Sequence, residues 1–570
     1  MPDKEQTVVT SEELRDGEMK QISAGGSDIL LARVNGKYHA VAAYCTHYGA
    51  PLVDGVLSGE RIVCPWHHAC FNATTGDLEE PPALDSLSCF PVRTENGKVL
   101  VDIPDDAKDR RTPTMTKREP NDERVFVIVG GGAAGYTAAQ TLREDGFTGR
   151  VIMITRETHL PYDRPNLSKE YLQGKADPAW IPLRSDTFFV EHDIEVISNR
   201  EVERVDAAKK LINFVDGESL ICDRLLVATG GEPRKLPFQT HEQQNVFLLR
   251  SHADVDAIIG AADKDKQAVV IGASFIGMEV AASLTKRGCK VTVVAPDVPF
   301  NRIFGPEIGH LFQKVHEEKG VEFKLGTSVT GFAGSTKVNA VMLDSGEHLH
   351  ADLVVVGIGV KPATGLLTGV KLHRDGGVLV DEYLRAAEGV YAAGDIAWFP
   401  SQLAGESQRI EHWRTAMQQG RVAAHNMAGK QTPYNGVPFF WTRQFDAGLL
   451  YIGHASSWDE IIYHGEVSAR DFLAYYISDS RVTAVAGMNR DKEMAALEEL
   501  MRFGRMPSPS QLRNGATDLA QLLNSATTEF NDHSLSNASS PLTKPNRTAV
   551  PTGVGPSRIL LLQGKTNQLL

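Results

Sequence analysis

The chain has 570 residues, of which 42% are apolar and 23% are charged, so a mostly disordered chain, a collagen and a coiled coil are excluded. This length predicts roughly three to five domains. The 59 Lys and Arg residues against 72 Asp and Glu residues give a formal net charge of −13. Because no broad basic surface is implied, neither nucleic acid nor an anionic membrane is an expected partner.

Cysteine usage and the N-terminus indicate the compartment. Six cysteines in a chain of this length exclude a disulfide scaffold. Cys222 and Cys289 lie in apolar contexts, and we expect them to be buried thiols. The first residues lack the basic and apolar regions of a secretory signal, and no stretch reaches the roughly 18 apolar residues of a membrane helix. We therefore expect a cytoplasmic protein without a membrane span.

Residues 1–103 carry a large share of the negative charge, with 8 Lys and Arg against 15 Asp and Glu. Short apolar runs at 29–34, 61–64 and 99–101 alternate with Gly, Asn and Asp turns, which predicts a small all-β domain. Residues 104–122 are charged, contain prolines and show no apolar periodicity. We interpret this second segment as a linker.

The strongest chemical signal is a pair of loops in this β-domain. Cys45 and His47 form the first loop, and Cys64 and His67 form the second. A [2Fe–2S] cluster with two cysteines on one iron and two histidines on the other needs this set of ligands. The alternative is a Cys₂His₂ zinc site, but zinc fingers pair Cys with Cys and His with His. Loops that each supply one Cys and one His favour the iron–sulfur cluster.

Residues 8–103 resemble a Rieske domain, including the turns at 49–52 and 71–76. Ala50 and Trp66 stand where the Rieske proteins of respiratory chains carry an extra pair of cysteines, so the resemblance implies no loop disulfide. Ala69 and Phe71 stand where those proteins carry Ser and Tyr hydroxyls. Because fewer hydrogen bonds to the cluster lower its potential, we expect a low-potential cluster like those of the Rieske ferredoxins that feed oxygenases.

Three other side chains near the ligand loops have simpler interpretations. The spacing C-x-x-H selects His67 as the ligand, and we expect its neighbour His68 to be exposed at the domain tip. Cys70 and Cys89 are interpreted as structural thiols.

From residue 123 the sequence changes to a βαβ pattern. Apolar runs at 125–129 and 151–154 enclose a glycine-rich turn and a helical stretch at 136–145. Such a turn allows close approach of a pyrophosphate and places its charge at the helix N-terminus. Glu157 lies about where an acid that binds the ribose belongs. The fingerprint residues are Gly130, Gly132, Ala134 and Gly135.

A second βαβ unit follows about 140 residues later, with apolar runs at 268–271 and 291–294. Ser274 replaces the middle glycine of its fingerprint. The second strand ends at Ala295, where the acid that would bind the ribose is absent, and no Arg follows closely. The sequence therefore leaves NADH and NADPH open as donors. The residues expected to contact the nucleotide are Gly272, Ser274, Phe275, Ile276 and Gly277.

The last part of the chain has a different composition. Aromatic and glycine-rich runs after residue 436, followed by a helical stretch at 491–503, predict an α+β domain over residues 436–525. Residues 526–570 are rich in Ser, Asn, Thr, Pro and Gly, and we interpret them as a disordered tail.

Residues 123–525 resemble the flavin-dependent ferredoxin reductases of the pyridine nucleotide-disulfide oxidoreductase class. The motifs are His-Leu-Pro-Tyr-Asp-Arg-Pro-Asn-Leu-Ser-Lys at 159–169, Ala-Thr-Gly at 228–230 and Tyr-Ala-Ala-Gly-Asp at 391–395. With the Rieske domain in front, the chain resembles the apoptosis-inducing factor-like (type 3) family. The implied fold class is multidomain, with an all-β Rieske domain, an α/β flavoprotein reductase with two dinucleotide-binding domains, and a C-terminal α+β domain. The implied FAD domain spans 123–245 and 366–435, and the NAD(P) domain spans 246–365.

The resemblance also implies roles for single residues. Glu279 would pair with Lys169 beside the flavin ring, and Asp395 would accept a hydrogen bond from a ribityl hydroxyl of FAD. Lys169, Glu279 and Trp413 are the expected catalytic residues. The remaining expected contacts to FAD or nicotinamide are Arg164, Thr229, Gly230, Gly359, Gly394, Glu411 and His412.

Residues 165–172 contain no cysteine, so the redox Cys pair of the disulfide-reducing members is absent. We predict that NAD(P)H reduces FAD and that FAD reduces the fused Rieske cluster, with the fusion raising the effective concentration of the acceptor. Two alternatives stay open. One is the reductase component of an oxygenase system with a separate acceptor protein, and the other is a redox-sensing signalling protein related to apoptosis-inducing factors.

Overall fold

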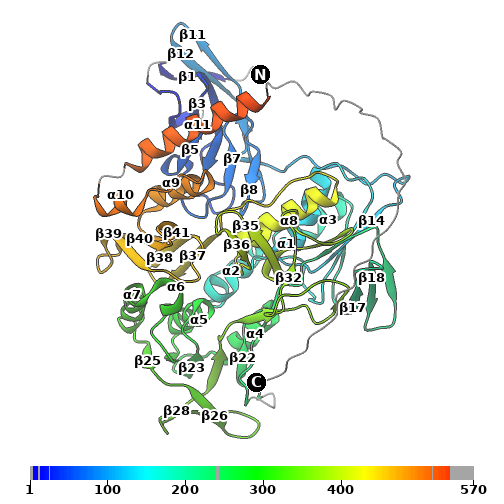
Figure 1. Cartoon of the computed structure of the whole chain (residues 1–570), viewed down its shortest axis with the longest axis vertical. Helices are drawn as coiled ribbons and strands as arrows, with labels where there is room; N and C mark the ends of the chain where they lie inside the picture. Colours follow the sequence, from blue (N-terminus) through cyan, green and yellow to red (C-terminus); the bar gives the residue numbers. More distant parts are fainter. Residues whose placement is uncertain are drawn as a thin grey trace, which may run out of the picture.

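The computed structural model describes residues 4–10, 13–24, 26–104, 106–238, 243–515 and 518–538. Its N-terminal part is a β-domain at one end of the molecule, built from antiparallel sheets (Figure 1). The expected runs at 29–34, 61–64 and 99–101 coincide with β3 (Ser27–Val34), β6 (Arg61–Val63, one residue shorter than expected) and β12 (Lys98–Ile103), which confirms the all-β prediction. The sheets are β1 (Lys4–Thr10)–β12 (Lys98–Ile103)–β11 (Val92–Glu95), β10 (Cys89–Phe90)–β4 (Lys37–Ala42)–β3 (Ser27–Val34)–β2 (Met19–Ala24), and β5 (Val56–Ser58)–β6 (Arg61–Val63)–β7 (Cys70–Asn72)–β8 (Leu78–Glu80).

The segment expected to be a linker is anchored at both of its ends. Strand β13 (Arg110–Arg111) pairs antiparallel with β9 (Ser86–Leu87) of the β-domain. Further on, the Thr116 N–H donates to Arg143 O at 2.9 Å and the Glu119 N–H donates to Thr148 O at 2.9 Å. The segment therefore joins the β-domain to the next domain through backbone hydrogen bonds rather than as a loose tether.

The first βαβ unit is formed by β14 (Val125–Val129), α1 (Ala133–Glu144) and β15 (Arg150–Ile154), as expected. Helix α1 begins directly after Gly132, whose extended backbone forms its N-cap. The unit belongs to a six-stranded sheet that the chain leaves and later re-enters, and α8 (Trp413–Met427) packs against α1. The sheet order is β16 (Ile194–Ile197)–β15–β14–β20 (Arg224–Val227)–β34 (Val390–Ala392)–β33 (Arg385–Ala387).

The second βαβ unit lies in a five-stranded parallel sheet, with α5 (Phe275–Lys286) as its crossover helix. The sheet order is β22 (Val246–Leu248)–β29 (Leu353–Val356)–β23 (Gln267–Ile271)–β24 (Lys290–Ala295)–β25 (Glu322–Leu325). The further α-helices between residues 146 and 320 are α2 (Arg164–Asn166), α3 (Asp186–Glu191), α4 (His252–Ala261), α6 (Asn301–Phe304) and α7 (Pro306–Glu317). Smaller strands are β17 (Val202–Asp206), β18 (Leu211–Phe214), β19 (Ser219–Ile221), β21 (Gly231–Pro233), β26 (Val329–Ala333), β27 (Ala340–Leu343), β28 (His348–His350), β30 (Val360–Pro362), β31 (Leu367–Thr368), β32 (Val378–Leu379), β35 (Ala397–Ser401) and β36 (Glu406–Gln408).

The C-terminal domain is an antiparallel sheet covered by helices, as the α+β prediction requires. The sheet order is β37 (Phe439–Gln444)–β38 (Ala447–Gly453)–β41 (Arg481–Met488)–β40 (Asp471–Ser478)–β39 (Glu460–Glu466), followed by α9 (Asp491–Arg502) and α10 (Pro509–Arg513). Among the described residues, no helix is both long and apolar enough to cross a lipid bilayer.

The expectation of a disordered tail from residue 526 is wrong for residues 526–538. They continue α11 (Leu519–Ala538), which lies against α9 and the β-domain strand β5 (Figure 1). Leu523 and Ala526, three residues apart on one helix face, are buried there, at 4% and 5% exposure. These apolar side chains of α11 therefore pack against the folded protein. Residues 539–570 lie outside the described part of the chain.

Candidate functional site

A cavity of about 300 Å³ lies where the first βαβ unit, the start of α5 and strand β37 meet. Most of the residues predicted to bind a cofactor line it. They are Gly130, Gly132, Ala134, Glu157, Arg164, Lys169, Thr229, Gly230, Phe275, Ile276, Glu279, Gly394, Asp395, Glu411, His412 and Trp413. Gly135, Gly272, Ser274, Gly277 and Gly359 do not line it.

The first glycine turn has the shape of a phosphate cradle. At Gly130, whose φ is +124°, a Cβ would lie 2.2 Å from Ala228 O, so only glycine fits. A Cβ at Gly135 would lie 1.9 Å from Gly130 O, which explains why the helix can pack so closely on the turn. A Cβ at Gly132 would meet no atom closer than Arg164 Nε, which would lie 3.9 Å from it, so the space there is open. The open space at the N-terminus of α1, facing a guanidinium, fits a pyrophosphate.

Glu157 lies on this cavity, held by two neighbours. Tyr162 donates its hydroxyl to Glu157 Oε2 at 2.5 Å, and Arg164 Nη2 donates to Glu157 Oε1. Burial alone would raise the pKa of Glu157, but Arg164 and Tyr162 outweigh it and the pKa lies below its usual value. The carboxylate is therefore charged and can accept hydrogen bonds from a ribose.

Asp395 lies in a 3₁₀ turn, η4 (Gly394–Ile396), and its carboxylate faces the cavity. Arg250 Nη2 donates to Asp395 Oδ2 at 2.7 Å. The side chain caps no helix, because its structural partner is this guanidinium. Gly230, with a φ of +68°, brings its backbone close to both groups, and Thr229 Oγ1 is held by Ala363 O at 2.8 Å. Sequence reasoning missed Arg250, which follows a strand end with no motif around it.

Lys169 and Glu279 meet at the cavity wall, as the resemblance implies. Lys169 Nζ donates to Glu279 Oε2 at 2.9 Å, and the Glu279 side chain is only 4% exposed. Ser168 Oγ donates to the same oxygen at 2.5 Å, and Thr442 Oγ1 donates to Glu279 Oε1 at 2.7 Å. Lys169 lies in a π-helical turn, η2 (Leu167–Tyr171), with a non-helical backbone conformation. Such turns are frequent at functional sites.

Glu411 and His412 lie directly before α8, whose first residue is Trp413, and all three line the cavity. Burial lowers the pKa of His412 to about 3, so its ring is neutral. Its Nδ1 atom is buried and has no hydrogen-bond partner among the described residues. A buried ring nitrogen without a partner beside the cavity fits a site in which a bound cofactor supplies the partner. Burial also raises the pKa of Glu411, against the opposing effect of Arg409.

The second glycine turn packs like the first but stands further from this cavity. A Cβ at Gly277 would lie 2.1 Å from Gly272 O, and Gly272 itself approaches Gly357 O. Ser274 forms the N-cap of α5 without a side-chain capping bond, which leaves its hydroxyl available. Gly359 has a φ of +93° and open space around it. Only Phe275, Ile276 and Glu279 of α5 reach the cavity.

The four predicted metal ligands lie together as two pairs. The Cys45 thiol hydrogen-bonds to Cys64, which holds the pKa of Cys45 well above its usual value. His47 Nδ1 and His67 Nδ1 face each other at 3.2 Å. Burial lowers the pKa of His47 to about 3, so the imidazole is neutral, the form that binds metals. A sulfur pair beside a nitrogen pair fits the two unlike irons of a Rieske cluster.

Backbone amides surround the two cysteines of these pairs. Backbone N–H groups of His47 and Tyr48 point at Cys45, and those of Trp66 and His67 point at Cys64. Amides directed at both sulfurs suit thiolates that belong to a cluster.

The expectation that His68 is exposed is wrong. Its side chain is 0% exposed, with its ring 4.1 Å from that of Phe439 and its Nδ1 bonded to Glu498. The tip of the β-domain is covered by β37 and α9 of the C-terminal domain. The sequence of the β-domain alone contains no sign of this cover. Cys89 is exposed because Phe90 is the inward-facing residue of that short strand, whereas Cys70 is buried.

The buried positions of Cys222 and Cys289, both 5% exposed, confirm the other thiol predictions.

Trp441 connects the ligand pairs with the cavity, and sequence reasoning missed it. It lines the cavity, and its ring centroid lies 4.6 Å from that of His67 and 6.5 Å from that of His47. Tyr48 stacks on His47 at 4.0 Å and donates its hydroxyl to Asp163. The run Phe-Phe-Trp at 439–441 reads as an ordinary strand, so only the packing reveals this contact.

Three family models match successive parts of the chain. Residues 4–91 match the Rieske [2Fe-2S] domain, and residues 124–420 match pyridine nucleotide-disulphide oxidoreductase. Residues 439–523 match the reductase C-terminal domain.

Individual proteins are similar over most of the chain. Apoptosis-inducing factor 3 of Mus musculus is 40% identical over 516 residues, which are 88% of this chain and 84% of the relative. Putidaredoxin reductase of Pseudomonas putida is 33% identical, with coverage of 71% of this chain and 98% of the relative. The solved covalent putidaredoxin reductase–putidaredoxin complex superposes with a TM-score of 0.68 at 32% identity, covering 71% of this chain and 99% of that chain.

Proposed function

Because the chain belongs to the pyridine nucleotide-disulphide oxidoreductase family and carries a Rieske domain in front, we propose that this NAD(P)H-dependent oxidoreductase passes electrons from its flavin to its own cluster. When bound, FAD takes a hydride from NAD(P)H and releases single electrons, and a [2Fe–2S] cluster accepts one electron at a time. The protein's part is to place these groups and to tune their surroundings.

The observation that carries this proposal is the position of Trp441. Trp441 lines the dinucleotide cavity, and its ring packs against His67. His47 and His67 would ligate one iron of the cluster. A single aromatic side chain then separates the flavin cavity from a cluster ligand.

The side chains of the cavity have complementary tasks. Gly130 and Gly132 would seat the pyrophosphate of FAD at the N-terminus of α1, which Gly135 allows to pack closely on the turn, and Glu157 would hold the ribose. Asp395 would hold the ribityl chain. The Lys169 ammonium, kept in place by Glu279, would attract the negative charge that the flavin ring gains on reduction. Ser274, Phe275, Ile276 and Gly277 would receive the nicotinamide nucleotide, with Gly359 and Trp413 near its path.

We further propose a division of the chain into functional parts and a compartment. The parts are the cluster domain at 1–103, the linker at 104–122, the FAD domain at 123–245 and 366–435, the NAD(P) domain at 246–365 and the C-terminal domain at 436–525. Six free cysteines, including the ligands Cys45 and Cys64, suit the reducing cytoplasm.

The test is anaerobic stopped-flow reduction of the purified protein by NADH and by NADPH, with the flavin and cluster absorbance bands followed separately. We expect both bands to bleach without any added protein. His67→Ala should lose the cluster signal and keep flavin reduction, because the ligands lie outside the flavin cavity. A cluster that stays oxidised beside a fully reduced flavin refutes the proposal.

A second candidate is the reductase of a system with a separate acceptor protein. It is favoured by the similarity to putidaredoxin reductase, whose solved complex contains putidaredoxin as a second protein. In the same experiment this function predicts turnover only when a ferredoxin is added. A long-lived reduced flavin with bound nicotinamide and no turnover would favour a sensor instead.

A further inference from the structure

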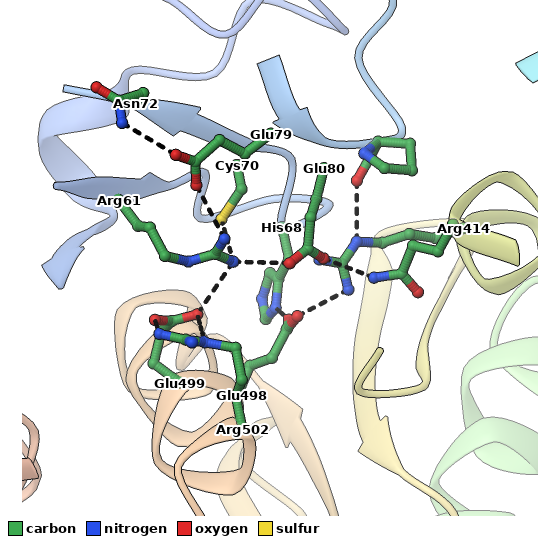
Figure 2. A network of polar contacts seen from close by, with 12 residues as sticks. Arg61, His68, Cys70, Asn72, Glu79, Glu80, Arg414, Glu498, Glu499 and Arg502 are labelled. Carbon is green, nitrogen blue, oxygen red and sulfur yellow. Dashed lines mark hydrogen bonds and ion pairs between the residues drawn. The ribbon is translucent and has the colours of Figure 1, made fainter. Parts of the chain in front are cut away.

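A network of buried charges joins the Rieske domain to two other parts of the molecule (Figure 2). It lies beside the ligand loop but contains none of the ligands. We call it the interdomain clamp. Its members are Arg61, His68, Glu79 and Glu80 of the Rieske domain, Arg414 of α8, and Glu498, Glu499 and Arg502 of α9.

Arg414 is the centre of the clamp and is fully buried, with a side-chain exposure of 0%. Its Nη2 atom donates to Glu80 Oε2 at 2.9 Å and its Nε atom donates to Pro81 O at 2.9 Å, both in the Rieske domain. Its Nη1 atom donates to Glu498 Oε1 at 2.7 Å, on α9. One guanidinium therefore joins three segments that are far apart in the sequence.

Arg61 makes the corresponding connection from the Rieske side. Its Nη2 atom donates to Glu80 Oε1 at 2.8 Å and to Glu499 Oε1 at 3.4 Å. Glu499 is 1% exposed and is also held by Arg502, at 3.0 and 2.6 Å. The network thus closes around Glu80, whose pKa is lowered to about 2 because Arg61 and Arg414 outweigh the effect of its burial.

The clamp reaches the cluster through His68, the residue that follows the ligand His67. Figure 2 shows its ring pointing from the Rieske loop toward Glu498 on α9. Phe439 packs against His68, and Trp441, two residues along the same strand, packs against His67. Because alternate residues of a strand share one face, β37 contacts both histidines at once.

An apolar contact supports the same arrangement. Val56, Val63 and Cys70 of the Rieske domain belong to one hydrophobic core with Phe439 and with buried residues of α9 and α11. The interface is therefore built like a domain interior. A mobile domain that docks only in passing is expected to have a smaller and more polar contact.

Buried charges make such an interface specific. Compared with apolar residues, a buried ion pair adds little net stability, but removing one partner leaves an unpaired charge in a dry environment. Displacing the Rieske domain would take Glu80 and Pro81 O away from Arg414, and His68 away from Glu498, while the Arg414–Glu498 pair between α8 and α9 would remain. The docked position, which satisfies all of these groups, is thus preferred over a shifted one.

We propose that the interdomain clamp holds the Rieske domain permanently in its electron-accepting position, with Arg414 as the positioning residue, so that transfer past Trp441 does not wait for domain motion. This inference rests on the proposed function, because it concerns the timing of electron transfer to the fused cluster. In this arrangement the cluster of the Rieske domain is a fixed electron acceptor rather than one on a tethered domain that diffuses to the flavin.

The experiment uses the full-length protein with both cofactors bound. Cluster reduction after mixing with NADH is followed by stopped flow, in buffer and in sucrose solutions of rising viscosity. In the native protein, we expect cluster bleaching to follow flavin reduction without a lag at every viscosity. Arg414→Gln should lower the ratio of docked to undocked protein by about 100-fold, since it removes the guanidinium that Glu80 and Glu498 share and leaves buried carboxylate charge uncompensated in the docked state.

In that variant, cluster reduction should lag behind flavin reduction, and the lag should lengthen with viscosity. Flavin reduction by NADH and the cluster spectrum should stay unchanged, which separates positioning from loss of either cofactor. Arg414→Lys keeps the charge and should restore part of the native behaviour. Arg513→Gln, which removes an exposed ion pair with Glu460 inside the C-terminal domain, is the matched control and should behave like the native protein.

The native protein and the Arg414→Gln variant together decide between a fixed and a mobile Rieske domain. A viscosity-dependent lag in the native protein, or an Arg414→Gln variant that reduces its cluster without a lag, overturns the fixed docking while the proposed function stands. A cluster that is never reduced overturns both. Should Arg414→Gln fail to retain a cofactor, Arg61→Gln is measured in its place, since it opens the same network from the Rieske side.

Discussion

Ala295 is the residue that bears on the choice between NADH and NADPH. It ends β24, and the Gly272 N–H donates to Val294 O at 2.9 Å, so the strand end lies beside the second glycine turn. An acid at such a position binds the ribose 2′-hydroxyl and disfavours a 2′-phosphate. The next carboxylate, Asp297, already accepts hydrogen bonds from the Val298 N–H at 2.8 Å and from Asn301 Nδ2 at 2.6 Å.

We therefore expect the native protein to use NADH and NADPH with similar kcat/KM. Ala295→Glu should raise the preference for NADH by about tenfold or more, because like charges placed together cost several kcal/mol. The measurement is kcat/KM for both donors, with flavin content as the check on folding. Ala179→Glu, an exposed substitution elsewhere, serves as the control. A native protein that already rejects NADPH would contradict this account.

Ala69 and Phe71 bear on the potential of the cluster. Both are 0% exposed, and Ala69 O accepts a hydrogen bond from the Cys64 N–H at 2.9 Å, so they lie against a ligand loop. Neither can donate a hydroxyl hydrogen bond. We expect a native potential nearer about −150 mV than about +300 mV, the limits of the Rieske range.

Ala69→Ser combined with Phe71→Tyr should raise this potential, because hydrogen bonds to the sulfurs stabilise the reduced cluster. A redox titration of the cluster signal measures the change. A native potential near the top of the range would show that the missing hydroxyls do not set it.

At the level of elements, helix α11 packs part of the C-terminal segment into the protein core. Its buried residues Leu523 and Ala526 pack into the core that α9 shares with the Rieske strands, and Thr527 Oγ1 lies 3.2 Å from Ser58 Oγ. The helix thus covers the junction between the first and last domains.

Leu523→Ala should lower the free energy of unfolding by about 2–5 kcal/mol, the usual cost of such a cavity in a core. Asn524→Ala, on the exposed side of the same helix, should change it little. Thermal melts of the loaded protein measure both. Equal melting temperatures for the two point variants would exclude a structural role for the buried face.

Deletion of residues 539–570 should leave flavin content, cluster content and NAD(P)H oxidation unchanged.

At the scale of the whole molecule, Asp163 couples the contact between domains to pH. The carboxyl group is buried, and burial raises its pKa to about 6 from 3.8, against the hydrogen bond from Tyr48 and the charge of Lys169, while Glu170 adds to the rise. A raised folded-state pKa means that the folded protein binds the proton more tightly than the unfolded chain. The contribution of Asp163 to the free energy of unfolding is therefore fully present below about pH 4. It is lost as pH rises through about 6, by about 3 kcal/mol in total.

Asp163→Asn removes this titration. Its melting temperature relative to the native protein should be higher at about pH 7.5 than at about pH 4.5. Tyr48→Phe, which removes the opposing hydrogen bond, should make the native dependence on pH steeper. A difference between Asp163→Asn and native protein that is the same at both pH values would contradict the assignment.

The local motifs were readable because their chemistry lies within short stretches of sequence. Cys45, His47, Cys64 and His67 belong to two loops, and the glycines after β14 act on the backbone next to them. A ligand spacing or a tight turn has the same meaning in any context. For this reason the cluster type, the fold class and the cofactors could be predicted, and the family matches confirm them.

The surroundings of these motifs depend on residues that are distant in the sequence. His68 meets Glu498 and Arg414 meets Glu80 only because β37, α8 and α9 pack over the ligand loop. The same packing places Trp441 between the cavity and His67 and turns part of a polar tail into α11. No spacing rule links such positions, since their contacts depend on how whole domains fit together. The sequence alone therefore specified which redox groups this protein holds, and the tertiary structure decided how closely and how firmly they face each other.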